Sequence, residues 1–177
     1  MKRSTYWKFN IFDIIRFNRG PQDLPTNIRL LNITILANIL IGQIPSDAQY
    51  NFIASLLTTT IFIGITLIFI QVCLYVKEAN TGMSNIYKAR YLQTASAVLG
   101  IHALIGLFAS LLFLMTKNDP NTVMIIVLLT SLYSWIVYGH IFKYTFDTSM
   151  IFGLAISFLY SMVAGFIMLL FLQAFFL

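Results

Sequence analysis

Five long apolar stretches, none of which contains an acidic residue, constrain this chain more than any other feature. They cover residues 28–44, 52–76, 95–115, 122–142 and 150–177. A helix needs about 20 mostly apolar residues to cross a hydrocarbon core of about 30 Å, whereas a strand of a membrane barrel alternates apolar and polar residues over about ten positions. Because lipid offers no partner to an open backbone group, these continuous runs predict helices. We therefore expect an all-α, polytopic membrane protein with five transmembrane helices in one bundle.

The composition agrees with this expectation and excludes other common classes. Of the 177 residues, 59% are hydrophobic and only 10% are charged, whereas a soluble domain carries roughly a quarter charged residues. Soluble and disordered chains are both excluded, and the single cysteine, Cys73, excludes an internal disulfide framework. The connections between the runs are short. The sequence therefore predicts one helical bundle over residues 28–177, preceded by a separate segment over residues 1–27.

The basic residues are unevenly distributed about the runs. Those that precede or begin the first run are Lys2, Arg3, Lys8, Arg16, Arg19 and Arg29. If the N-terminus lies inside, Lys117 is the only one of the 11 basic residues that faces outward, which agrees with the positive-inside rule. The sequence thus predicts an N-terminus inside and a C-terminus outside, in the cytoplasmic (inner) membrane if the chain is bacterial. The net charge of +5 then indicates contact with anionic headgroups of the lipid bilayer and not with nucleic acid.

The segment before the first run combines basic and aromatic residues, as helices that lie in the headgroup layer do. At helical spacing, Trp7 lies on a face with Ile11, Ile14 and Ile15, and the basic residues lie towards another face. We expect an interfacial amphipathic helix. The residues expected to anchor it to the membrane surface are Trp7, Lys8, Arg16 and Arg19. A docking helix for a partner protein is the alternative.

The stretch Arg19-Gly20-Pro21-Gln22-Asp23-Leu24-Pro25 directly precedes the first run. A cytoplasmic segment with this stretch, followed by five apolar runs, resembles the bacterial branch of the Yip1-like membrane proteins. The resemblance implies a five-span protein with a membrane-organising or scaffolding role and no defined reaction. The motifs typical of the eukaryotic members are not present, so the resemblance implies neither their trafficking roles nor any site residue.

No constellation of reactive residues is recognisable in the sequence. All six acidic residues lie outside the runs, which argues against an ion-coupled pump, because a pump usually keeps an ionisable group inside the membrane. Two histidines, His102 and His140, do lie in runs. At a rise of 1.5 Å per residue their depths differ by roughly 9 Å, which is too much for a shared haem. We expect no enzyme activity, no cofactor and no metal.

Two of the runs carry regular stripes of small residues, which let helix backbones approach closely in lipid. One stripe repeats every fourth residue in the last run, at Gly153, Ser157, Ser161 and Gly165. The other follows the third run, at Ser96, Gly100, Ala103, Gly106 and Ser110. We predict that both stripes are helix-packing surfaces. Two interpretations stay open: the stripes pack within one chain, or they form the contact with a second copy or with another membrane protein.

Hydroxyl and amide side chains recur in three runs. They include Thr34, Asn38, Thr59, Thr66 and Ser134. Hydrogen bonds between helices explain such residues, and so does the lining of a small polar path. With several packing surfaces and no reactive constellation, the leading hypothesis is a non-catalytic integral membrane protein that acts by association, in membrane organisation, as a scaffold or as an accessory subunit. The alternative is a small channel or carrier formed by an oligomer.

Overall fold

The structure is a computed structural model that describes residues 7–44, 52–82, 87–116 and 119–176, with side chains described over 11–44, 52–82, 89–116 and 119–174. Every regular element in these ranges is helical, which confirms the predicted all-α class. In chain order the elements are α1 (Trp7–Ile15), the short 3-10 helix η1 (Pro21–Asp23), α2 (Ile28–Gly42), α3 (Phe52–Thr81), α4 (Tyr87–Met115), α5 (Pro120–Phe146) and α6 (Met150–Phe176).

Four of these helices, α3 to α6, are long and apolar enough to cross a membrane, as expected of a multi-pass membrane protein. The apolar helix α2 is shorter. Its 15 residues extend over about 22 Å at 1.5 Å per residue, which is less than a hydrocarbon core of about 30 Å. The fifth crossing that the sequence predicts therefore stays a prediction.

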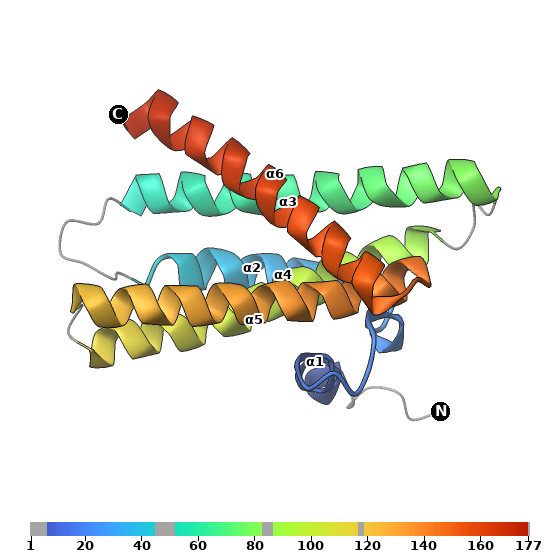
Figure 1. Cartoon of the computed structure of the whole chain (residues 1–177), viewed down its shortest axis with the longest axis horizontal. Coiled ribbons are helices and arrows are strands. Elements are labelled where there is room, and N and C mark those ends of the chain that lie inside the picture. The colour runs from blue at the N-terminus through green and yellow to red at the C-terminus, as the bar shows by residue number, and fades with distance from the viewer. Residues whose placement is uncertain (1–6, 45–51, 83–86, 117–118, 177) are drawn as a thin grey trace.

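α4 is the central helix of the bundle. It lies between α2 and α5 and also contacts α3, whereas α6 packs mainly on α5 and crosses α3 (Figure 1). All residues of α4 from Gln93 to Ile101 are buried, although a helix at the edge of a bundle buries only one stripe. The first half of α4 is thus covered on all sides, and α2, α3 and α5 pack directly on α4.

The N-terminal segment packs on α4 and α5. In Figure 1 α1 is seen almost end-on, so it lies across the long axis of the bundle. Ile14 is fully buried, and the Tyr133 hydroxyl of α5 donates to the carbonyl oxygen of Ile15 at 2.9 Å. The isoleucine face that the helical spacing groups together is therefore covered by the chain's own bundle.

Of the four residues predicted to anchor this segment to the membrane surface, two have side chains that the structure describes. Arg16 and Arg19 are exposed, and Arg19 forms an ion pair with Asp13 at 3.4 Å. The side chains of Trp7 and Lys8 lie outside the described residues. Contact of these four residues with headgroups stays a prediction.

The stretch that follows α1 is held by side chains of the bundle. The Gln93 amide of α4 donates to the carbonyl oxygens of Gln22 at 2.9 Å and Leu24 at 2.7 Å. His140 Nε2 of α5 donates to the carbonyl oxygen of Arg19 at 2.8 Å, because a carbonyl oxygen can only accept. The stretch on which the family resemblance rests is thus folded onto α4 and α5.

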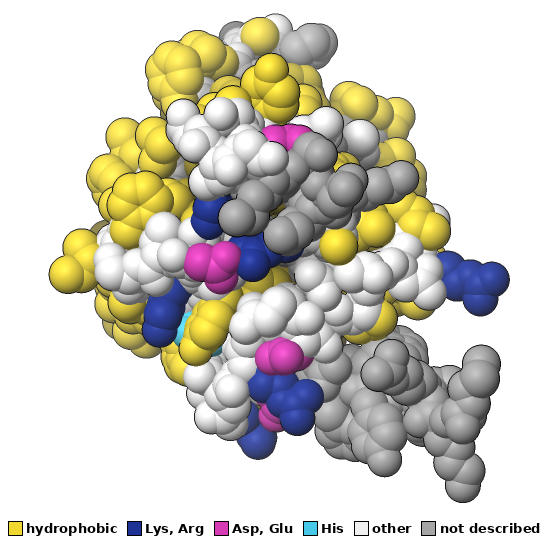
Figure 2. Space-filling view, turned by 90° about the vertical axis from the view of Figure 1, so that its right-hand side faces the viewer, with side chains coloured by type: hydrophobic (Ala, Val, Ile, Leu, Met, Phe, Trp, Pro, Cys, Tyr) yellow, Lys and Arg dark blue, Asp and Glu magenta, His cyan; other side chains and the backbone are white. Residues whose placement is uncertain are grey.

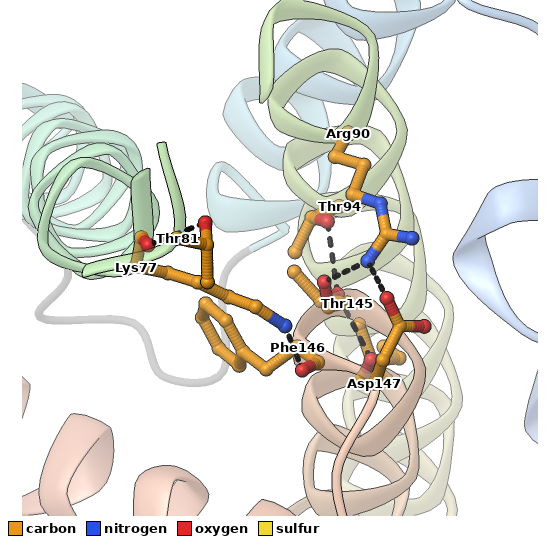
Figure 3. Close-up of polar contacts among 8 residues, drawn as sticks. Lys77, Thr81, Arg90, Thr94, Thr145, Phe146 and Asp147 are labelled. Carbon is orange, nitrogen blue, oxygen red and sulfur yellow. Dashed lines mark hydrogen bonds and ion pairs between the residues drawn. The ribbon is translucent and has the colours of Figure 1, made fainter. Parts of the chain in front are cut away.

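Charged side chains gather at the end of the bundle where α5 ends and α6 begins (Figure 2). Lys77 of α3 donates to the carbonyl oxygen of Phe146, and Arg90 of α4 donates to that of Thr145 at 2.7 Å (Figure 3). Arg90 also pairs with Asp147 at 2.6 Å. The last carbonyl groups of a helix lack partners within it and carry partial negative charge, so nearby cations stabilise them. These contacts join α3, α4 and α5 at one end.

Candidate functional site

The first half of the small-residue stripe on α6 lies against α5. A Cβ atom added at Gly153 would lie 2.8 Å from the amide nitrogen of Lys143 and closer still to the carbonyl oxygen of Gly139. The Ser157 hydroxyl, four residues on, donates to the carbonyl oxygen of Trp135 at 2.8 Å. The two backbones therefore meet at Gly153 with no room for a side chain between them.

The second half of this stripe is less covered by the bundle. Ser161 is exposed but still lines a cavity with residues of α4 and α5, whereas a Cβ atom added at Gly165 would meet no described atom within 4 Å. A step of four residues advances the stripe by about 40° on a helix with 3.6 residues per turn, so the stripe drifts off the buried face. That face continues instead through Tyr160 and Ala164, which are both buried.

The stripe of α4 faces different neighbours. Its buried or half-buried residues are Ser96, Gly100, Ala103, Gly106 and Ser110. A Cβ atom added at Gly100 would lie 3.1 Å from Ile11 of α1 and 3.2 Å from Thr34 of α2. Within the chain the stripe of α4 thus meets α1 and α2, whereas the stripe of α6 meets α5. The stripe of α4 and the stripe of α6 therefore do not pack on each other.

Two polar side chains join α2 to α4 inside the bundle. The Asn38 amide donates to the carbonyl oxygens of Thr34 and Leu99, both at 2.7 Å, and its own oxygen lies 2.7 Å from Nδ1 of His102. Because the two carbonyl oxygens only accept, the NH2 group must face them, and Asn38 Oδ1 accepts from Nδ1–H of His102. In the neutral ring the other nitrogen, Nε2, is then an acceptor. Phe62 of α3 stacks on the imidazole with 4.1 Å between ring centroids.

His102 borders two cavities. The first has a volume of about 360 Å³ and extends towards the end of α2. The second has a volume of about 380 Å³ and lies among α3, α4, α5 and α6. Phe62, His102 and Gly106 line both. Thr59 lines the first cavity and Ser134 the second, so two of the hydroxyl residues that the sequence singles out face the interior.

Most polar groups of the second cavity already have a partner. The Tyr160 hydroxyl and Thr66 Oγ1 share a hydrogen bond of 2.8 Å, and Ser134 donates to a carbonyl oxygen of its own helix. Tyr138 differs, because its side chain is only 4% exposed and its hydroxyl has no hydrogen-bond partner among the described residues. Two polar groups of its lining residues, the Tyr138 hydroxyl and Nε2 of His102, therefore lack a hydrogen-bond partner among the described residues.

The two histidines take part in separate contacts, His102 towards α2 and His140 towards the N-terminal segment. No three His, Cys, Asp or Glu side chains within the described ranges lie close enough to hold a metal ion. Sequence reasoning missed the pairing of Asn38 with His102, which lie 64 positions apart, and the unpaired hydroxyl of Tyr138. The available signal was a few polar residues on otherwise apolar helices.

The polar groups that line the two cavities are suited to hydrogen bonding. These groups are hydroxyls, the Asn38 amide, the His102 imidazole and the Trp135 indole N–H, and the described residues that line the two cavities include no carboxylate and no thiol. The hydroxyls of Thr58, Ser134 and Ser161, which line the cavities, each donate to a carbonyl oxygen of the same helix. Comparisons of the chain with models of protein families, with curated proteins and with solved structures found no match.

Proposed function

We propose that this chain is a non-catalytic integral membrane protein that acts by association, and that it associates through the outer half of α6. One observation carries the proposal. The small-residue stripe reaches the surface there: Ser161 borders a cavity of the bundle but is exposed, and no described atom lies within 4 Å of a Cβ at Gly165. In lipid, contacts between helices are enriched in small residues because backbones can then approach closely.

The occupant we propose for this surface is a second copy of the chain. In a two-fold dimer whose axis runs along the membrane normal, the same patch of each copy faces its counterpart. A pair of small residues four positions apart, such as Ser161 and Gly165, is the pattern that supports close parallel crossing of identical helices. If another membrane protein occupied this surface, the chain would still act by association, but with a different partner.

Disulfide crosslinking in membranes tests this association. The single native cysteine is replaced in a Cys73→Ser background, and Ser161→Cys is added. We expect a crosslinked dimer, and we expect Gly165→Leu in the same chain to abolish it, because a bulky side chain would separate the two backbones. Leu159→Cys, on the opposite side of α6, is the matched control and should stay monomeric. Equal crosslinking at both positions, or no effect of Gly165→Leu, would contradict a dimer through this surface.

A small channel or carrier formed by the oligomer is the second candidate. The observation that favours it is that Thr59 and Ser134 line cavities inside the bundle. The crosslinked dimer in liposomes tests it: solute flux that falls in a Ser134→Leu variant would support a carrier. Solute flux no faster than in empty liposomes would exclude a channel or carrier, and association would then be the only function proposed.

We also propose that the chain crosses the cytoplasmic membrane five times, with α2 as the first crossing. The N-terminus then lies on the inner side of this membrane. Lys77, Arg90 and Lys143 lie towards one end of the bundle, and the N-terminal segment precedes α2 at that end, which is consistent with the positive-inside rule. Labelling of single cysteines in intact cells is the test. Asn121→Cys should react with an impermeant reagent, and Asn80→Cys should react only after the cells are opened; the reverse result would invert the topology.

A further inference from the structure

The second cavity has the size and the access that a small ligand needs. Its volume of about 380 Å³ falls within the usual range of ligand pockets, about 300–1,000 Å³. Ser131 lines the cavity and is exposed, so the cavity reaches the outer surface of the bundle. A molecule dissolved in the bilayer can therefore enter it from the side.

Two polar groups determine what the ligand must offer. His102 Nε2 requires a hydrogen-bond donor, because Nδ1 already donates to Asn38. The Tyr138 hydroxyl is buried and has no partner in the described ranges, and it can donate or accept. A ligand hydroxyl group matches both, since it can donate to His102 and accept from Tyr138. A ligand carbonyl group matches only the second.

The walls of the cavity add two requirements. Its aromatic side chains are Phe62, Trp135, Tyr138 and Tyr160. Aromatic rings attract one another in offset or edge-to-face arrangements, so these walls favour an aromatic ligand. None of the described lining residues carries a carboxylate, an ammonium or a guanidinium group. An unpaired ion would be strongly disfavoured there, so the ligand is neutral.

An apolar groove adjoins the cavity. The groove has a volume of about 610 Å³, lies between α4 and α5 beside α1, and shares Ile105 and Thr130 with the cavity. Its other lining residues are aliphatic or aromatic. An apolar substituent on the ligand ring therefore has a place next to the cavity.

We propose that this cavity binds a lipid-soluble phenol or quinol, with the phenolic hydroxyl between His102 and Tyr138 and the apolar substituent towards the groove. The inference concerns binding alone and does not depend on association through α6. An ordered water is the competing occupant, because buried waters commonly satisfy such polar groups.

Trp135 provides a reporter at the site. The chain has two tryptophans, so Trp7→Phe leaves Trp135 as the only one. The full-length Trp7→Phe protein in phosphatidylcholine nanodiscs is titrated with para-decylphenol and with para-decylanisole, its methyl ether, which keeps the ring and tail but lacks the hydroxyl donor. We expect a saturable change in Trp135 fluorescence with the phenol and an affinity for the ether that is lower by about fivefold or more.

Tyr138→Phe tests the hydroxyl itself. Because that hydroxyl has no partner among the described residues, its removal leaves no other protein group unpaired, and thermal stability should not fall. The phenol should bind about fivefold more weakly. The matched control is Tyr75→Phe, at a side chain that is 70% exposed, which should bind the phenol as the parent protein does.

Four results would overturn the proposal. Equal affinity for the phenol and its methyl ether would mean that the ring only partitions into lipid. Equal affinity of the phenol for the parent and Tyr138→Phe proteins would mean that the buried hydroxyl binds water and not the ligand. Decanol, titrated in the same way, lacks the ring, and tighter binding of decanol than of the phenol would exclude the aromatic requirement. Binding that persists in a Gly165→Leu protein supports a site within one copy, whereas binding lost with the dimer overturns it.

Discussion

Gly153→Ala is expected to destabilise the protein by about 3 kcal/mol, at the upper end of what overpacking of a core costs. The methyl group would lie 2.8 Å from the amide nitrogen of Lys143 and closer to the carbonyl oxygen of Gly139. Both atoms belong to the backbone of α5, so no side chain can rotate aside, and α5 and α6 must separate. The gain of about 1 kcal/mol in helix propensity when Ala replaces Gly does not offset this cost.

Unfolding in mixed detergent micelles, followed by the fluorescence of Trp135, measures this effect. Trp135 suits the purpose because its indole N–H donates to the carbonyl oxygen of Leu154, next to the same helix contact, at 3.1 Å. Gly165→Ala is the control on the same helix and the same stripe. It should leave stability unchanged or raise it slightly, since no described atom lies within 4 Å of its Cβ position. Similar losses in both variants would refute the assigned contact.

The contrast between these two glycines indicates how far a sequence pattern reaches. The four-residue repeat of the stripe places four small residues along α6. It does not say which members are buried, because a repeat of four residues rotates steadily around a helix of 3.6 residues per turn. The buried face passes from Ser157 to Tyr160, a large residue that the stripe does not include.

Helix ends show a similar limit. The apolar runs predicted α3, α4 and α5, but each helix is longer than its run at the charged end. There α3 continues to Thr81, α4 already begins at Tyr87, and α5 continues to Phe146. Lys77 and Arg90 lie in these extensions and hydrogen-bond the last carbonyl groups of α5. Hydropathy ends a span at the first charges, whereas the charges here have partners on a neighbouring helix, which a local pattern does not reveal.

Long-range pairs were beyond the reach of sequence reasoning altogether. The isoleucine spacing of the N-terminal segment indicated an interfacial amphipathic helix, and Ile14 of that face is buried within the protein itself. Nothing in the segment indicates that Gln93, about 70 positions away, holds Gln22 and Leu24. Gln93 precedes the apolar run 95–115, so the apolar pattern gave no sign that its amide is buried and needs partners.

Asn38→Leu is expected to destabilise the bundle by about 2 kcal/mol, which combines the loss of bonds between helices with the cost of an unpaired buried donor. Asn38 is buried, and its amide bonds the carbonyl oxygen of Leu99 and Nδ1 of His102, both on α4. Leucine nearly preserves the volume of the side chain, but it leaves Nδ1–H of His102 without an acceptor. The same micelle unfolding assay measures the loss, and Asn32→Leu, at an exposed position of α2, should be neutral.

Two further variants separate the bond from mere packing. Asn38→Asp should be worse than Asn38→Leu, because a carboxylate cannot donate to the carbonyl oxygens of Thr34 and Leu99 and would be a buried charge. In a double-mutant cycle, His102→Phe added to Asn38→Leu should cost less than the two single changes together, because the donor left unpaired in Asn38→Leu is then absent. Strict additivity would mean that α2 is held to α4 by apolar packing alone and that Asn38 does not set the orientation of His102.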